Sequence, residues 1–250
     1  MSSVSQTVHS ESPAGPVRDL TVFFPFHDER ENIERVARAA VEVLDGLGLE
    51  YEVLLVDDGS TDGTGAIADS LAASDSRIRA LHHPVNRGYG AALRTGFANA
   101  ARTWVFYTDG DGQFDLADLP KVLALAGEYD IVSAYRIGRK EGLVRKLMAW
   151  CWGRAVRAVL GVRVRDVDCA FKLYRRELFD HIEMQSEGAL IDAEILARAA
   201  RAGYTVGQVA VPHYPRRSGQ SSGGNLGVAL RAVRELLRLR KSIRATPKVK

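Results

Sequence analysis

Short apolar runs alternate with amphipathic segments from Leu20 to Ala134, and this alternation constrains the fold more than any other feature. In residues 31–44, for example, apolar side chains recur at spacings of three and four, which predicts a helix. Continuous apolar strands separated by helices are typical of a parallel sheet that is covered on both faces. The sequence therefore predicts an α/β fold with a mostly parallel central sheet flanked by helices on both faces. The expected strands are 20–24, 51–56, 78–81, 104–107 and 131–134, and the expected helices are 31–44, 64–73, 90–100 and 116–126.

We expect a single folded domain, because neither internal repeats nor a linker divides the chain. The first residues are rich in Ser and Pro, which predicts a disordered leader over residues 1–17. The folded domain is expected over 18–225. A basic amphipathic helix and tail are expected over 226–250.

Cysteine content and hydropathy bear on the compartment in which the chain works. The two cysteines, Cys151 and Cys169, are too few for a disulfide framework. The N-terminus lacks the charged start and apolar core of a signal peptide. No stretch of about eighteen uncharged apolar residues predicts a membrane span. We therefore expect the protein in a reducing cytoplasm.

Positive charge is concentrated at the C-terminus. Residues 231–250 hold eight Lys or Arg and one Glu, a net charge of +7, whereas the whole chain carries +3. The rest of the chain therefore carries −4 (3 − 7). Such a tail suits contact with anionic lipid or nucleic acid, or it remains solvated without a partner.

Polar residues follow the expected strands at the points where the strands end. In open sheets of this kind, ligands bind beyond the carboxyl ends of the strands, where the loops converge. The sequence thus predicts a site at one edge of the sheet that collects several carboxylates and an arginine. These residues are Asp28, Glu29, Asp57, Asp58, Asp109, Asp111 and Arg136.

The segment DGDGQ, residues 109–113, predicts a metal site. Clustered carboxylates repel one another unless a cation offsets their charge. Asp109 and Asp111 lie two residues apart between glycines, and Gln113 adds a neutral oxygen. Oxygen ligands of this kind favour Mg²⁺ or Mn²⁺ over zinc. The alternative is a turn that caps the following helix, with Asp115 as the N-cap.

Four motifs in order, PFHDE (25–29), VDDGSTD (56–62), NRGYGAAL (86–93) and DGDGQ (109–113), resemble those of glycosyltransferase family 2. The resemblance covers about residues 20–222, and within the family the chain is most similar to the dolichol-phosphate or polyprenol-phosphate mannosyltransferase group. It implies a nucleotide-sugar-binding fold of the GT-A type, with 18–225 as the catalytic domain.

The resemblance also implies roles for individual residues. The metal, Mg²⁺ or Mn²⁺, is expected on Asp109, Asp111 and Gln113, and the catalytic residues are expected to be Asp111, Arg136 and Asp166. His27 and Asp28 depart from the family pattern, which usually has an aromatic residue and Asn there. The residues expected to bind the nucleotide sugar are Pro25, His27, Glu29, Val56, Asp58, Asp109, Gly110, Asp111, Arg136 and Arg216.

Two further segments resemble the acceptor side of the family: DVDCAFKLYRR (166–176) and HYPRRSGQSS (213–222). Asp166 could deprotonate a hydroxyl acceptor, or it could orient Lys172 or Arg175. A phosphate acceptor needs positive charge rather than a base, because its second pKa is about 6. Ser222 stands where the family often has Lys. The residues expected to bind an acceptor phosphate are Arg136, Arg216, Arg217 and Ser221.

Two amphipathic segments suggest where in the cell the enzyme binds its acceptor. In residues 145–162, basic side chains lie beside Trp, which suits a lipid headgroup layer or, alternatively, an ordinary core-packing helix. From residue 226 onward, apolar Leu226, Leu230, Val233 and Leu237 are flanked by Arg231, Arg234, Arg238 and Lys241. This stripe predicts attachment to the cytoplasmic membrane surface, or self-association. Nucleic acid is not expected, because no aromatic residues interleave the basic ones.

These observations lead to one expected function and two alternatives. We expect an inverting glycosyltransferase, peripheral at the inner face of the cell membrane, that moves a hexose from GDP-mannose or UDP-glucose to polyprenyl phosphate. A membrane-protein partner or a homo-oligomer is compatible with this expectation. The first alternative is transfer to a hydroxyl of a polysaccharide or secondary metabolite, with Asp166 or helical Asp192 or Glu194 as base. The second is a non-catalytic module that binds a nucleotide sugar.

Overall fold

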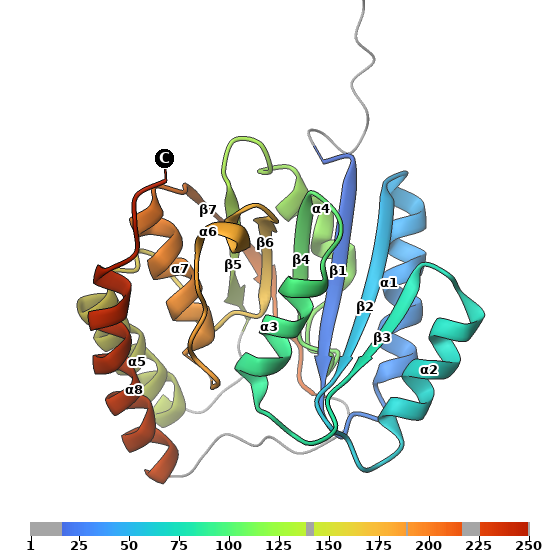
Figure 1. Ribbon diagram of the computed structural model, residues 1–250, viewed down its shortest axis with the longest axis horizontal. Helices are drawn as coiled ribbons and strands as arrows, with labels where there is room; N and C mark the ends of the chain where they lie inside the picture. Colours follow the sequence, from blue (N-terminus) through green and yellow to red (C-terminus); the bar gives the residue numbers. More distant parts are fainter. Residues whose placement is uncertain (1–16, 139–142, 189, 217–225, 250) are drawn as a thin grey trace, which may run out of the picture.

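The computed structural model describes residues 17–138, 143–188, 190–216 and 226–249, with the backbone alone over 143–151 and 226–234. A central sheet is built from seven strands in the order β3-β2-β1-β4-β6-β5-β7 (Figure 1). The strands are β1 (Asp19–Phe26), β2 (Glu50–Asp57), β3 (Ile78–His82), β4 (Trp104–Thr108), β5 (Ile131–Ile137), β6 (Phe171–Arg175) and β7 (Val206–Pro212).

The sheet is mostly parallel, as the sequence predicts. Strands β1, β2, β3 and β4 run parallel to their neighbours, and β5 runs parallel to β7. Strand β6 is antiparallel to both β4 and β5. Thr108, the last residue of β4, pairs with Phe171, the first residue of β6. The segment before β6 therefore reaches the same edge of the sheet as the carboxyl ends of the parallel strands, at the bottom of Figure 1.

Helices cover both faces of the sheet (Figure 1). Side chains alternate along each strand, so Phe23 joins one buried cluster while Val22 and Phe24 join the other. Helices α1, α2 and α4 close the second cluster, and α3, α6 and α7 close the first, with α5 and α8 packed outside α7. The helices are α1 (Ile33–Leu47), α2 (Thr64–Ser74), α3 (Tyr89–Asn99), the 3₁₀ turn η1 (Leu116–Asp118), α4 (Leu119–Leu123), α5 (Leu143–Leu160), α6 (Leu178–His181), α7 (Ile191–Ala202) and α8 (Leu226–Arg244).

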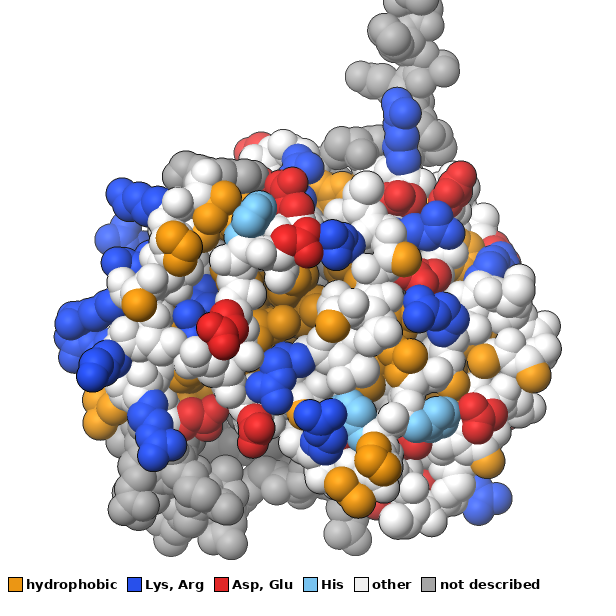
Figure 2. All heavy atoms as spheres, in the orientation of Figure 1, with side chains coloured by type: hydrophobic (Ala, Val, Ile, Leu, Met, Phe, Trp, Pro, Cys, Tyr) orange, Lys and Arg blue, Asp and Glu red, His pale blue; other side chains and the backbone are white. Residues whose placement is uncertain are grey.

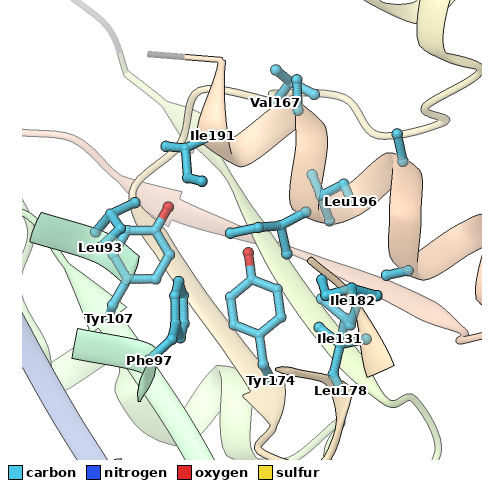
Figure 3. Packing of buried hydrophobic residues seen from close by; sticks show 14 of the residues in the cluster. Leu93, Phe97, Tyr107, Ile131, Val167, Tyr174, Leu178, Ile182, Ile191 and Leu196 are labelled. Atoms are coloured by element: carbon cyan, nitrogen blue, oxygen red, sulfur yellow. The ribbon is translucent and has the colours of Figure 1, made fainter. Parts of the chain in front are cut away.

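Aromatic side chains dominate the cluster under α3 and α7. The ring of Phe97 meets those of Phe23, Tyr107 and Tyr174 edge-on, at centroid distances of 4.9, 5.7 and 5.5 Å. Figure 3 shows the rings of Phe97, Tyr107 and Tyr174 between α3, the sheet and α7. Edge-to-face pairs add about 0.5–1.5 kcal/mol each to the stabilisation that burial provides. This packing fixes β1, β4 and β6 next to one another, and the candidate site lies at the edge of the sheet that they form.

Helix α8 is part of the folded core. Leu236, Leu239 and Ile243 are buried in the same cluster as α7, and the amide of Val249 donates to the carbonyl oxygen of Ala202 at 3.0 Å. The expected boundary between a domain at 18–225 and a separate tail at 226–250 therefore differs from the structure over its described residues. Residues 1–16 of the expected leader lie outside the described residues, and Val17 is already buried.

Helix α5 turns a slightly different face to the core than the sequence suggests. Helical spacing in residues 145–162 places Trp152, Ala155 and Val159 on one apolar face, but Val156 is the fully buried residue and Ala155 is exposed. Trp152 and Val159 pack against the cluster at its margin. Within the described residues, no helix combines the length and the apolar character that crossing a bilayer demands.

Candidate active site

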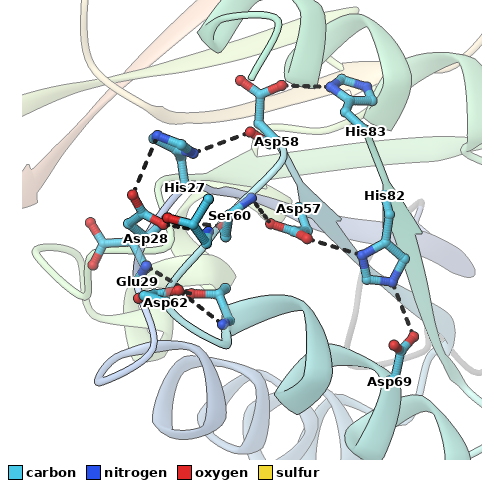
Figure 4. A network of polar contacts seen from close by, with 12 residues as sticks. His27, Asp28, Glu29, Asp57, Asp58, Ser60, Asp62, Asp69, His82 and His83 are labelled. Carbon is cyan, nitrogen blue, oxygen red and sulfur yellow. Dashed lines mark hydrogen bonds and ion pairs between the residues drawn. The ribbon is translucent and has the colours of Figure 1, made fainter. Parts of the chain in front are cut away.

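The loops that follow β1 and β2 are joined by a polar network at the edge of the sheet (Figure 4). The amide of Thr61 donates to the carboxylate of Asp28 at 2.8 Å, and the amide of Asp28 donates to Ser60 Oγ at 3.0 Å. The ring of His27 bonds the carbonyl oxygen of Asp58 through Nδ1 at 3.1 Å. Asp28 has φ 52°, a conformation that Asp tolerates better than most residues. These contacts fix both loops as one wall of the site.

Asp57 supports this wall from behind. Its carboxylate accepts the amide of Ser60 at 3.0 Å and contacts Nδ1 of His82 at 3.0 Å. Burial alone would raise the pKa of Asp57, but the hydrogen bonds from Ser60 and His82 outweigh it and lower the pKa below the ordinary value. Asp57 is thus held ionised and supports the loop after β2.

The carboxylate of Asp58 makes more hydrogen bonds within the protein than the sequence suggests. Its buried carboxylate bonds Nδ1 of His83 at 2.6 Å and accepts the amides of Arg87 and Gly88, each at 2.9 Å. Its hydrogen bonds hold the loop before α3, although its surface borders the cleft. Val56, which was expected to border the nucleotide, is fully buried in the core. Its side chain does not line the cleft.

A cleft of about 700 Å³ lies at the carboxyl ends of β1, β2 and β4. Eight of the ten residues expected to bind the nucleotide sugar line it, and the exceptions are Val56 and Arg136. Gly110 fits tightly, because a Cβ there would lie 2.2 Å from the ring of Phe26. The eight lining residues are Pro25, His27, Glu29, Asp58, Asp109, Gly110, Asp111 and Arg216.

Arg216, from the segment after β7, joins two carboxylates of the cleft. Its Nη2 lies 2.7 Å from Glu29 Oε1 and 3.3 Å from Asp111 Oδ2. Asp109 lies beside this pair, and its pKa is raised to about 7, first by burial and then by the charge of Asp111. Burial likewise raises the pKa of Glu29, although Asn32 and Arg216 oppose the shift. The cleft therefore concentrates negative charge that one arginine balances only in part.

Two carboxylates of the expected metal set face this cleft, whereas the third ligand lies elsewhere. Asp109 and Asp111 both line the cleft. Gln113 donates its side-chain amide to the carbonyl oxygen of Tyr214 at 3.0 Å and does not line the cleft. Among the described residues, no three His, Cys, Asp or Glu side chains converge as a metal site. A cation here would need further ligands, which the phosphate oxygens of a bound nucleotide can supply.

The two remaining residues expected to be catalytic, Arg136 and Asp166, bind each other. The guanidinium of Arg136 donates from Nε and Nη2 to the two Asp166 oxygens at 2.7 and 2.8 Å. The backbone amide of Arg136 also donates to Asp166 Oδ2, at 3.2 Å. Burial lowers the pKa of Arg136, but the bond to Asp166 outweighs this and raises it overall. Asp166 therefore orients Arg136, not Lys172 or Arg175. Arg217 and Ser221 lie outside the described residues.

Sequence reasoning missed a buried ion pair beneath the site. Lys172 is fully buried, and its Nζ donates to Asp192 Oδ1 at 2.7 Å and to the carbonyl oxygen of Cys169 at 2.5 Å. Asp192 is buried rather than solvated, and so is Glu194, which accepts the amides of Gln185 and Ser186. The signal in the sequence was a lysine inside the otherwise apolar run FKLY.

Asp168 was also overlooked. It interacts electrostatically with Asp192, Lys172, Asp166 and Arg136. Although Asp168 is an exposed residue, desolvation by the surrounding protein, followed by the charge of Asp192, raises its pKa to about 6. A carboxylate with such a pKa is a reasonable proton acceptor near neutral pH. Asp168 does not line the cleft of Asp109 and Asp111, so its raised pKa is what favours it as a base.

The fold and the cleft define a class of protein. The seven-stranded, mostly parallel sheet with paired carboxylates beyond β4 is a nucleotide-sugar-binding α/β fold of the GT-A type. The chain belongs to glycosyltransferase family 2, since residues 21–183 match the family described as Glycosyl transferase family 2. It is therefore a glycosyltransferase.

Solved structures of glucosyl-3-phosphoglycerate synthase from Mycobacterium tuberculosis share this fold. A complex with Mn²⁺, UDP and glucosyl-3-phosphoglycerate is 23% identical, with a TM-score of 0.69 over 99% of this chain and 88% of that one. A complex with Mn²⁺ and UDP-glucose is 21% identical, with a TM-score of 0.69 over 99% and 86%. A complex with Mg²⁺ and UDP is 22% identical, with a TM-score of 0.68 over 98% and 86%.

Proposed function

We propose that this enzyme transfers a hexose from a nucleoside diphosphate sugar to polyprenyl phosphate, with inversion and with Mg²⁺ or Mn²⁺ in the donor cleft. The observation that carries the proposal is the joint placement of Asp109, Asp111 and Arg216 around one cleft. The dolichol-phosphate and polyprenol-phosphate mannosyltransferase group is the proposed subgroup, because the motifs of the chain resemble it most.

The cleft fits a cation bound together with a diphosphate. Asp109 and Asp111 would hold the ion, and the pKa of Asp109 is raised first by burial and then by the charge of Asp111, which a cation would offset. A divalent cation there stabilises the charge that develops on the leaving diphosphate. Arg216 contacts Asp111 in this structure and would be released to donate to the phosphates. His27 and Pro25 line the wall available to the base and ribose.

The donor is proposed to be UDP-glucose or GDP-mannose. The glucosyl-3-phosphoglycerate synthase structures contain UDP or UDP-glucose with Mn²⁺ or Mg²⁺, which supports a nucleoside diphosphate sugar and a divalent cation in a cleft of this fold. Those structures concern a different acceptor, phosphoglycerate. The feature common to phosphoglycerate and polyprenyl phosphate is a phosphate group.

Two carboxylates near the site are already paired with cations, which supports a phosphate acceptor. Asp166 is paired with Arg136 and Asp192 with Lys172, each at 2.7 Å, so both carboxylates serve to hold cations. A phosphomonoester needs no general base, since its second pKa is about 6 and it is mostly dianionic near pH 7. Arg136, held in place by two hydrogen bonds to Asp166, is proposed to bind that phosphate.

Asp168 supports transfer to a hydroxyl as a second candidate function. Replacing Asp168 distinguishes a polyprenyl phosphate acceptor from a hydroxyl acceptor. If the acceptor is polyprenyl phosphate, Asp168→Asn is expected to change kcat by less than about threefold, because no proton must be removed. If a hydroxyl is the acceptor, the same change removes the base and lowers kcat by about 10²–10⁴-fold. The measurement is the transfer rate from labelled donor to each acceptor. Asp118→Asn, whose carboxylate pairs with Lys121, is the matched control.

Stabilisation by Mn²⁺ is expected to increase with pH. The folded pKa of Asp109, about 7, exceeds the ordinary value of 3.8, so the folded metal-free protein holds this proton more tightly than the unfolded chain. The resulting stability is complete below about pH 4 and is lost as pH rises through about 7. Mn²⁺ competes with the proton, so the rise in Tm caused by saturating Mn²⁺ should be larger at about pH 8 than at about pH 6. Equal rises at both pH values, or a rise retained in Asp111→Asn, would contradict this expectation.

We further propose that the enzyme is peripheral at the cytoplasmic membrane face and binds it through α8. Figure 2 shows Lys and Arg side chains gathered at the left edge, where α5 and α8 lie in Figure 1. Leu237 is 58% exposed, and Arg240, Lys241 and Arg244 are exposed near it on the side of α8 opposite the core. Leu237 is the last residue of the expected apolar stripe. The side chains of Leu226, Leu230 and Val233 lie outside the described residues.

The membrane proposal predicts a loss of vesicle binding without a loss of fold. Each basic residue contributes about 1 kcal/mol near an anionic surface, so replacing Arg240, Lys241 and Arg244 by Gln should weaken binding to anionic vesicles by roughly 100-fold. Co-sedimentation measures this change. The control replaces three exposed cations outside α5 and α8, Arg18, Arg38 and Lys121, and should leave binding unchanged. Equal weakening by both sets would show that only net charge matters and would contradict the role of α8.

A further inference from the structure

One residue of the cleft, Tyr89, has no role in the proposed reaction yet bonds directly to a proposed metal ligand. Its hydroxyl donates to Asp109 Oδ1 at 2.9 Å. Tyr89 lines the same cleft as Asp109 and Asp111 and packs its ring against the core. A hydrogen bond from a phenol to one carboxylate oxygen fixes the rotamer of the carboxylate and leaves the other oxygen available to a cation.

The motif NRGYG, residues 86–90, holds Tyr89 in place. On one side, the Asp58 carboxylate accepts the amides of Arg87 and Gly88. On the other side, the amide of Gly90 donates to the carbonyl oxygen of Glu187 at 2.9 Å. A Cβ at residue 90 would lie 2.6 Å from the carbonyl oxygen of Ser186, so only glycine permits this approach. The motif therefore clamps the start of α3 between two segments that are distant in sequence.

Beneath Tyr89, a second set of polar contacts lies in the core. The hydroxyl of Tyr107 interacts electrostatically with that of Tyr89 and donates to Asp192, the partner of Lys172. Figure 3 shows the Tyr107 hydroxyl directed towards Ile191, the first residue of α7, which also carries Asp192. A buried network of this kind is rigid when all its members have partners. Tyr89 and Asp109 thus lie beside a rigid polar network that contains a buried ion pair.

We propose that Tyr89 is a positioning residue for the metal site: its hydroxyl, on a ring held by the NRGYG segment, fixes Asp109 for a divalent cation. The inference rests on the proposed metal-dependent function. It adds a residue outside the expected metal set of Asp109, Asp111 and Gln113. Loss of a partner of this kind commonly weakens metal binding by about 10–100-fold.

The test is Mn²⁺ binding to the intact protein, followed by the electron paramagnetic resonance signal of free Mn²⁺ without nucleotide. Tyr89→Phe keeps the ring and removes the hydroxyl, and it is expected to raise the Kd for Mn²⁺ by at least about tenfold. Tyr51→Phe is the matched control, because it removes a similar bond, from Tyr51 to Asp45 at 2.5 Å, far from the cleft. Tyr51→Phe should leave the Kd for Mn²⁺ unchanged.

A second readout separates positioning from a merely structural role. For Tyr89→Phe, the Mn²⁺ concentration that gives half-maximal transfer should rise about tenfold, while the rate at saturating Mn²⁺ stays within about threefold. Equal Mn²⁺ affinity of Tyr89→Phe and the wild type would overturn the inference and leave the proposed function intact. Absence of Mn²⁺ binding by the wild type would overturn both.

Discussion

Replacing Asp111 by Asn is expected to lower the rate of sugar transfer by about 10³-fold, because metal stabilisation of the leaving group is worth several kcal/mol and each 1.36 kcal/mol is a factor of ten. Asn keeps the shape of the side chain but removes the charge that would hold the cation. The fold should survive, because Arg216 retains its bond to Glu29 at 2.7 Å. The same substitution should abolish the dependence of the rate on Mn²⁺ concentration.

The measurement is kcat/KM for transfer from labelled donor at saturating and at chelated Mn²⁺, with thermal unfolding of each variant measured in parallel. Asp118→Asn is the matched control, since it removes a carboxylate a few residues further on whose partner is Lys121. It should leave kcat/KM within about twofold. A residual activity of Asp111→Asn above about one tenth of the wild type would contradict a catalytic role for a cation at this carboxylate.

The second large effect is expected on stability, from Lys172→Met. Breaking a buried ion pair by removing one partner typically costs about 3–5 kcal/mol, because the remaining charge stays buried. Asp192 is buried, and it would keep only the hydroxyl of Tyr107 as a close partner. A loss of this size is a large part of the 5–15 kcal/mol that stabilises most folded proteins. Denaturant unfolding measures the change.

A double-mutant cycle tests whether the cost arises from the unpaired charge. Lys172→Met combined with Asp192→Asn removes both charges, so it should be less destabilising than the sum of the single changes by about 2 kcal/mol. Arg38→Met, which breaks an exposed pair with Glu34, is the control and should cost less than about 1 kcal/mol. Additive single changes, or a cost for Lys172→Met no larger than for the control, would contradict the importance of the buried pair.

The local elements of this fold follow from short-range patterns in the sequence. The expected helix 31–44 corresponds to α1 (Ile33–Leu47), and the expected strand 104–107 corresponds to β4 (Trp104–Thr108), because alternation and helical spacing report directly on which residues face a core. The expected helix 116–126 is shorter and broken. There, a 3₁₀ turn passes into the five-residue α4 at Leu119, followed by Pro120 in its first turn.

Contacts between distant segments could not be predicted in the same way. The antiparallel course of β6 depends on strand pairing across the sheet, which local periodicity does not encode. The pairing of Arg136 with Asp166 and of Lys172 with Asp192 joins residues 30 and 20 positions apart. Motif spacing indicated that Arg136 and several carboxylates gather at one edge of the sheet. It did not indicate which of them neutralise one another, and that decides which residues remain available for chemistry.

The identity of the acceptor is the central claim, and one measurement tests it most directly. The intact enzyme with Mn²⁺ is given labelled UDP-glucose or GDP-mannose and, in separate reactions, polyprenyl phosphate in detergent, 3-phosphoglycerate or a polysaccharide. The account predicts Mn²⁺-dependent label in the organic phase with polyprenyl phosphate, from one of the two donors, and little label on the other acceptors. Label that appears only on a soluble acceptor, with none extracted into the organic phase, would contradict it.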